Sequence, residues 1–135
     1  MIKLNGHFLN NPTAISSLQK LYEASGIPSV SIYRIGKIHD RVHQELRRVG
    51  ERAISTHKKY CLLDPSGQPS GLAQGKLEFL EPKEENEKKH DKEFVELLDR
   101  EFEIKVNPIP ISHLVVLLTR EEILSLESIL LDTGD

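Results

Sequence analysis

The chain has 135 residues and a formal net charge of -3. This length fits one compact domain, and the slightly acidic balance argues against a general affinity for nucleic acid or anionic membranes. The lone cysteine, Cys61, cannot close an intrachain disulfide, and no cationic leader or membrane-length apolar segment is evident, so we expect a soluble, unprocessed, cytosolic protein.

The first residues predict a short strand followed by a helix. Residues 1–9 alternate weakly between apolar and polar side chains, which is typical of a strand or hairpin arm. Asn11 and Pro12 then offer an N-cap with proline at the first helical position, and Gly26 is a natural C-cap.

A long amphipathic helix is predicted from Ser29 to about Leu63. Its apolar side recurs with a period close to 3.67 residues, which keeps one face of an almost straight helix aligned. That stripe consists of Ile38, Val42, Leu46, Val49, Ala53, His57 and Tyr60. Gly36 and Gly50 lie inside the helix, and we interpret them as positions where another element packs closely.

After this helix, Gly, Pro and Ser predict a flexible loop over residues 64–75. Residues 76–80 fit a short strand. A second helix is expected from Lys83 to about Arg100, with charged first turns and apolar last turns.

The C-terminal part predicts a strand over residues 102–106, room for another short strand, and a closing helix. Thr119 and Glu122 have the spacing of a capping box for that helix. Its expected buried residues are Ile123, Leu126, Ile129 and Leu130. The predicted fold class is α+β and mostly helical: a long antiparallel helical hairpin, a small antiparallel sheet and a C-terminal helix, all in a single domain.

Charge differs between the two long helices. Residues 34–59 carry eight basic and three acidic side chains, whereas residues 78–103 carry eleven acidic and five basic ones. Opposite charges favour an antiparallel pairing of the two helices. The candidate interaction surface consists of Arg41, Arg47, Arg48, Arg52, Glu84, Glu85, Glu87 and Asp91.

His39 and His43 have the i, i+4 spacing that lets two imidazoles share a metal ion. The other histidines, His7, His57, His90 and His113, show no motif spacing, so we interpret the pair as solvated residues and expect no metal site.

Signatures of an enzyme are also missing. No nucleophile with a placed base, phosphate-binding loop or calcium loop is found, and Cys61 is interpreted as a packing residue. We therefore expect no catalytic residues and no cofactor. The basic side chains lack interleaved aromatic residues, which disfavours direct nucleic-acid binding.

Several stretches carry a family resemblance. Ile27-Pro28 leads into Ile32-Tyr33-Arg34-Ile35-Gly36-Lys37-Ile38, and later come Lys92-Glu93-Phe94-Val95-Glu96-Leu97-Leu98, Phe102-Glu103-Ile104 and Leu118-Thr119-Arg120-Glu121-Glu122-Ile123. These passages resemble small uncharacterised proteins of tailed phages that have a long helical hairpin. The resemblance implies a phage origin and a role in protein interaction.

Together these observations predict a non-enzymatic phage protein that acts through protein–protein contacts as a head or tail component of the virion or as an assembly factor. It would self-associate, as repeated virion parts do, and would be found in the host cytoplasm, the virion or both. The alternative is an early inhibitor that binds a host or defence protein through its acidic helix or its basic face.

Overall fold

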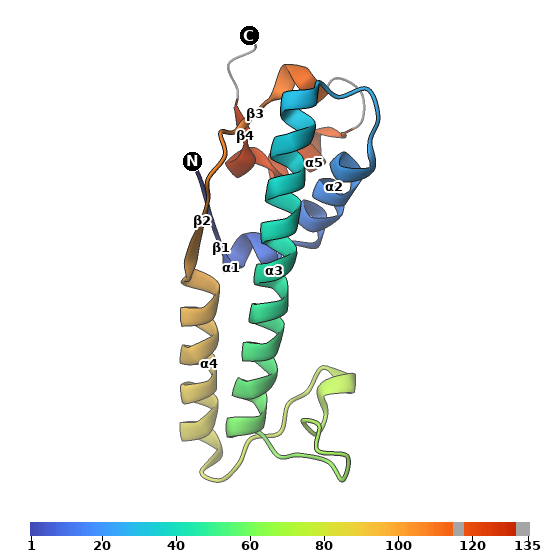
Figure 1. Cartoon of the computed structure of the whole chain (residues 1–135). Helices are drawn as coiled ribbons and strands as arrows, with labels where there is room; N and C mark the ends of the chain where they lie inside the picture. Colours follow the sequence, from blue (N-terminus) through green and yellow to red (C-terminus); the bar gives the residue numbers. More distant parts are fainter. Residues whose placement is uncertain (115–117, 132–135) are drawn as a thin grey trace. The chain divides into compact units, whose positions relative to one another are not determined.

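The computed structural model describes residues 1–114 and 118–131. The chain divides into two compact units: unit 1 comprises Met1–Leu46 and Arg100–Asp135, and unit 2 comprises Arg47–Asp99. Helix α3, Ser29–Tyr60, contributes to both units (Figure 1). The fold class is α+β and mostly helical, as predicted.

A two-stranded antiparallel sheet in unit 1 joins β1, Ile2–Asn5, to β2, Glu101–Ile104. Ile2 lies opposite Ile104 and Leu4 opposite Phe102, and all four side chains are buried. The alternation of buried and exposed residues along β2 confirms the predicted strand, although it ends at Ile104, before Val106.

Two helices follow β1 in unit 1. Helix α1, Gly6–Leu9, is a single turn that was not predicted, and it starts where the Asn5 side chain accepts hydrogen bonds from the His7 and Phe8 N–H groups. Helix α2, Pro12–Glu23, confirms the Asn11 cap, because that side chain accepts from Thr13 and Ala14. The prediction of Gly26 as its C-cap is wrong: α2 ends at Glu23 and Ala24 is the C-cap. Gly26 lies in the bend that follows, where its φ of 80° is in the left-handed region that favours glycine.

Helix α3 ends at Tyr60, close to the predicted end. Ile38 and Val42 of its apolar stripe are fully enclosed together with Ile35, whereas the stripe is half-buried from Leu46 onward. The interpretation of its two glycines as close-packing positions is wrong. No heavy atom other than the helix's own backbone lies within 4 Å of where a Cβ would stand at Gly36 or Gly50, so nothing in the described structure requires glycine there.

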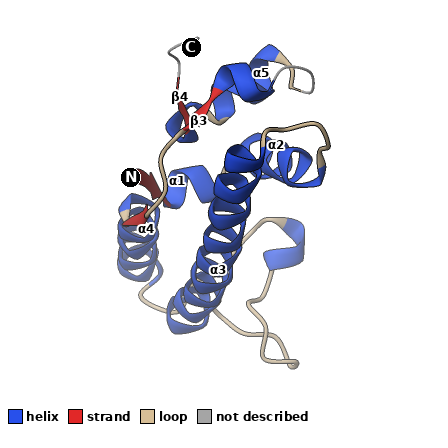
Figure 2. Ribbon diagram, turned by 45° about the horizontal axis from the view of Figure 1, so that its top comes forward, coloured by secondary structure: helices blue, strands red, loops and turns tan. Residues whose placement is uncertain are grey.

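The C-terminal part of unit 1 is built from short elements (Figure 2). Strand β3, Ile109–Pro110, pairs in parallel with β4, Leu130–Leu131, while α5 spans Arg120–Ser125. Two 3-10 turns, Ile111–Leu114 and Glu127–Ile129, complete this part.

The predicted capping box of α5 is confirmed: Thr119 accepts from the Glu122 N–H, and Glu122 accepts from the Thr119 N–H. The closing helix is shorter than predicted, because the chain passes through a 3-10 turn into β4. Leu126 and Ile129 are buried, whereas Ile123 and Leu130 are only half-buried. In the apolar sequence stretch 114–118, residues 115–117 lie outside the described residues.

Unit 2 is the hairpin formed by the second half of α3 and by α4, Lys83–Asp99 (Figure 1). The segment between them contains the 3-10 turn Leu72–Gln74. The prediction of a strand over residues 76–80 is wrong. This segment forms one isolated antiparallel bridge, between Phe79 and Cys61, and its backbone pairs with only a few residues at and after the end of α3.

The apolar core is unevenly divided between the units. Nineteen apolar side chains are buried in the described part of the chain, and two of them, Cys61 and Leu97, belong to unit 2. The other seventeen are in unit 1. Across the described residues, no helix combines the length and the apolar character that crossing a membrane requires.

Candidate functional site

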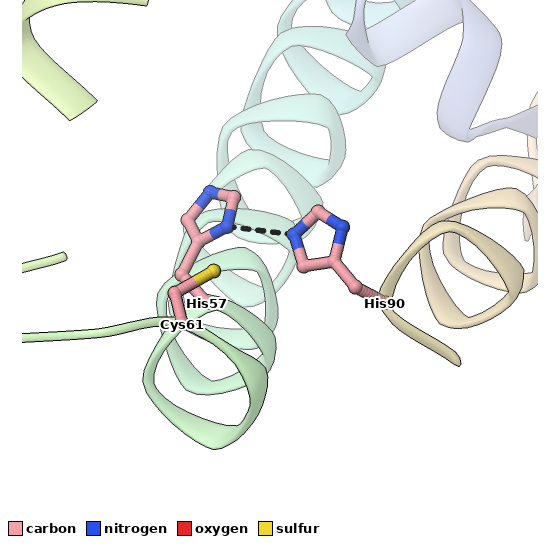
Figure 3. A group of neighbouring side chains, drawn as sticks. All are labelled: His57, Cys61 and His90. Atoms are coloured by element: carbon pink, nitrogen blue, oxygen red, sulfur yellow. Dashed lines mark hydrogen bonds between the residues drawn. The ribbon is translucent and has the colours of Figure 1, made fainter. Parts of the chain in front are cut away.

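Three side chains with metal-binding chemistry converge near the end of the hairpin in unit 2: His57, Cys61 and His90 (Figure 3). His57 and Cys61 are one helical turn apart, and the Cys61 N–H donates to the His57 carbonyl oxygen at 2.8 Å, which continues the helical geometry past the last residue of α3. His90 comes from α4.

The two imidazole rings are in hydrogen-bond contact. Nδ1 of His57 lies 3.0 Å from Nε2 of His90, and the ligand atoms of all three residues lie within 4.8 Å of one another. The remaining ring nitrogen of His90, Nδ1, lies 3.1 Å from a carboxylate oxygen of Asp91.

Two phenylalanines orient these rings. Phe94 stacks against both, with ring centroids 5.0 Å from His57 and 4.7 Å from His90. Phe79 presents an edge contact to His90 at 5.2 Å between centroids. Cys61 and His90 are buried, and His57 is half-buried.

Burial favours the neutral forms of His57 and Cys61. It lowers the pKa of His57 from its usual value, and the neighbouring His90 lowers that pKa further. Burial also raises the pKa of the Cys61 thiol. The His57 imidazole is therefore in the state that can bind a metal ion, whereas the thiolate requires a nearby positive charge.

Glu93 forms a second polar group on the same hairpin. Its carboxylate accepts from Lys59 at 2.8 Å, from the Tyr60 hydroxyl at 2.7 Å and from the Thr56 hydroxyl at 3.3 Å. The contacts with Lys59 and Tyr60 hold the pKa of Glu93 below its usual range, and the hydrogen bond with Glu93 raises the pKa of Lys59.

The predicted histidine pair is arranged differently. The His39 ring stacks on Tyr22 with a centroid distance of 3.7 Å and lies 4.2 Å from the His43 ring. Its Nε2 contacts the Gln19 side chain at 3.0 Å and its Nδ1 contacts Asp40 at 3.4 Å, so both ring nitrogens are engaged. His43 is exposed, as predicted. The interpretation of His39 as solvated is wrong, because its side chain is half-buried and packs against Tyr22.

The predicted charged surface is distributed over both units. Arg41 belongs to unit 1, where it is half-buried and forms an ion pair with the buried Glu45 at 3.0 Å. Its guanidinium also lies over the Phe102 ring at 5.6 Å, so this residue has a packing role. The other members are exposed in unit 2: Arg47, Arg48 and Arg52 on α3, and Glu84, Glu85, Glu87 and Asp91 on α4.

The first turns of α3 carry exposed apolar side chains in unit 1. Val30, Ile32 and Tyr33 are 49%, 52% and 63% exposed. The Lys37 ammonium lies 5.5 Å from the centroid of the Tyr33 ring and leaves that ring accessible.

The three-residue cluster was missed in the sequence. Its signal was the His57–Cys61 spacing, the same i, i+4 spacing that drew attention to His39 and His43. His90 carries no such signal, because its approach depends on how α4 packs against α3. His57 and His90 show no motif spacing in the sequence, but the fold brings their rings into contact.

Comparisons of the chain with protein-family models, curated proteins and solved structures found no match.

Proposed function

We propose that the chain is a non-enzymatic phage protein that works by binding other proteins, as a component of the virion head or tail or as an assembly factor, and that it self-associates. The feature that supports this proposal is the exposed apolar group at the start of α3, formed by Val30, Ile32 and Tyr33. Isolated exposed apolar residues are ordinary, but three within four residues of one helix favour a contact surface.

The neighbouring backbone strengthens this interpretation. Gly36 follows Ile32 by one turn on the same side of α3, and the space over its α-carbon is open. A helix of a partner protein can approach closest where a glycine carries no side chain. Ile32 and Gly36 therefore give the proposed surface an apolar side chain beside an uncovered stretch of backbone.

Light scattering coupled to size-exclusion chromatography tests self-association, and mass spectrometry of purified phage particles tests incorporation. We expect the wild-type chain to form oligomers and to be present in particles. The double variant I32S/Y33S should weaken self-association at least about tenfold, because it removes two apolar anchors from the contact.

The matched control is V95S, which removes a similarly exposed apolar side chain (57%) from α4. It should leave association unchanged. A strictly monomeric wild-type chain that is absent from particles would contradict the proposal. A stoichiometric host protein captured by such a monomer would favour the alternative, an early inhibitor.

A further inference from the structure

We propose that His57, Cys61 and His90 bind a Zn²⁺ ion. All three belong to unit 2, so the site is formed within one compact unit. It is independent of the exposed surface on the first turns of α3.

The donor set is that of a zinc site. A cysteine sulfur and two imidazole nitrogens are ligands that zinc accepts, whereas calcium and magnesium take oxygen ligands. His57 belongs to α3, Cys61 directly follows the last residue of α3, and His90 belongs to α4 (Figure 3). A bound ion would therefore join the two helices of the hairpin.

The spacing of the donor atoms is close to what a tetrahedral ion requires. With Zn–N bonds of about 2.0–2.1 Å, two nitrogen ligands stand roughly 3.3 Å apart. His57 Nδ1 and His90 Nε2 are 3.0 Å apart, so a small separation of the rings would admit the ion. One ring nitrogen of each histidine and the sulfur of Cys61 lie within 4.8 Å of one another.

Asp91 prepares His90 for this role. Its carboxylate lies 3.1 Å from His90 Nδ1, which favours the tautomer with the proton on Nδ1 and the lone pair on Nε2, toward His57. A carboxylate behind a metal-binding histidine is the usual supporting arrangement in zinc sites.

These contacts determine which protons leave the site when a metal ion binds. The tautomer that Asp91 favours makes His90 Nε2 an acceptor, so without metal the Nδ1–H of His57 donates to it. On metal binding the Nδ1 proton of His57 leaves and its Nε2 takes one from solvent, so the ring stays neutral. The Cys61 thiol loses its proton to solvent, and one proton is released for each ion bound. The dication then offsets the negative charge on the buried sulfur.

Three protein ligands leave one tetrahedral position for water. In the described part of the chain, no fourth histidine, cysteine or carboxylate joins the group. The nearby carboxylate of Glu93 is already bound to Lys59, Tyr60 and Thr56. Because the buried apolar core of unit 2 is small, an ion that joins α3 to α4 would add directly to its stability.

Titration of the full chain with Co²⁺, a spectroscopic substitute for Zn²⁺, tests the site. We expect one equivalent to produce a sulfur-to-cobalt charge-transfer band together with the visible bands of tetrahedral cobalt, and Zn²⁺ to displace both. C61S should abolish the charge-transfer band. H90A should weaken Zn²⁺ binding at least about 100-fold, because loss of a metal ligand should cost more affinity than the roughly 10- to 100-fold that is typical for loss of a residue supporting a ligand. Competition with a colorimetric chelator measures this affinity.

Two further variants separate metal binding from folding. D91N keeps the size of an exposed side chain and should weaken Zn²⁺ binding about 10- to 100-fold. H43A removes an exposed histidine from α3, the helix that carries His57, and should bind like wild type. Circular dichroism should show unchanged helicity in both. A wild-type chain without the charge-transfer band would overturn the proposal, as would loss of the band in H43A.

Discussion

At the scale of single residues, Glu122 combines a local and a distant contact in unit 1. Its carboxylate accepts from the Thr119 N–H at 2.9 Å and forms an ion pair with Lys20 of α2 at 2.9 Å. The hydrogen bond from Thr119 is the main reason why the pKa of Glu122 lies below its usual value of 4.5, and Lys20 lowers it further.

This depressed pKa predicts a pH dependence of stability. A carboxyl with a lower pKa in the folded state contributes stability above its unfolded pKa and loses it as pH falls through the folded pKa. The free energy of unfolding should therefore fall less between about pH 6 and about pH 3 in E122Q than in wild type, because Gln keeps the cap but not the charge. Urea unfolding at both pH values measures this.

E121Q is the control for that comparison, since Glu121 is exposed in the same helical turn. It should show the wild-type pH dependence. Equal losses in E122Q and wild type would mean that the Glu122 charge contributes nothing to folding.

Local side-chain chemistry made some residue roles predictable. Asn11 and Thr119 cap helices within three residues of themselves, so sequence spacing alone identifies them. His90 meets His57 across 33 positions of sequence, and that contact depends on the packing of α4. Contacts of this kind leave no local pattern to read.

At the scale of elements, Glu93 connects α4 to the end of α3. Four side chains meet there: Glu93, Lys59, Tyr60 and Thr56.

The boundaries of α3 and α4 are close to those predicted, because apolar periodicity and the turn-forming loop determine them locally. The strand expected at 76–80 required a partner strand, and the chain after α3 supplies a single bridge at Cys61.

The Glu93 contacts predict a measurable stabilisation of the hairpin. E93Q should lower the free energy of unfolding by about 1 kcal/mol, because the side chain is partly exposed and solvent screens its charge. E96Q makes the same change at an exposed position of α4 and should stay within about 0.5 kcal/mol of wild type. Chemical unfolding followed by circular dichroism compares them, and equal stability of the two variants would contradict the role assigned to Glu93.

At the scale of the whole molecule, the two units differ in how many apolar side chains they bury. Helix α2 in unit 1 buries Ala14, Ser17, Leu18 and Leu21, whereas α4 in unit 2 buries His90 and Leu97. The single domain predicted from chain length made no distinction between them. Composition does not reveal how apolar residues divide between compact units.

Hydrogen exchange measured by mass spectrometry should reveal this difference. In the presence of a chelator, which removes any contribution from bound metal, we expect amides of α4 to exchange at least about tenfold faster than amides of α2. Few buried apolar contacts lower the free energy of local opening. Equal protection of α2 and α4 would show that the small core of unit 2 does not limit its stability.

The sparse core of unit 2 also bears on how this chain can change over generations. Most side chains of α4 face water, and replacements at such positions usually alter stability little. The charge of α4 can therefore drift while the helix persists, whereas the densely buried positions of unit 1 tolerate few replacements. Descendants of this chain would diverge first at the exposed positions of α4, so a new binding preference could arise there without rebuilding the rest.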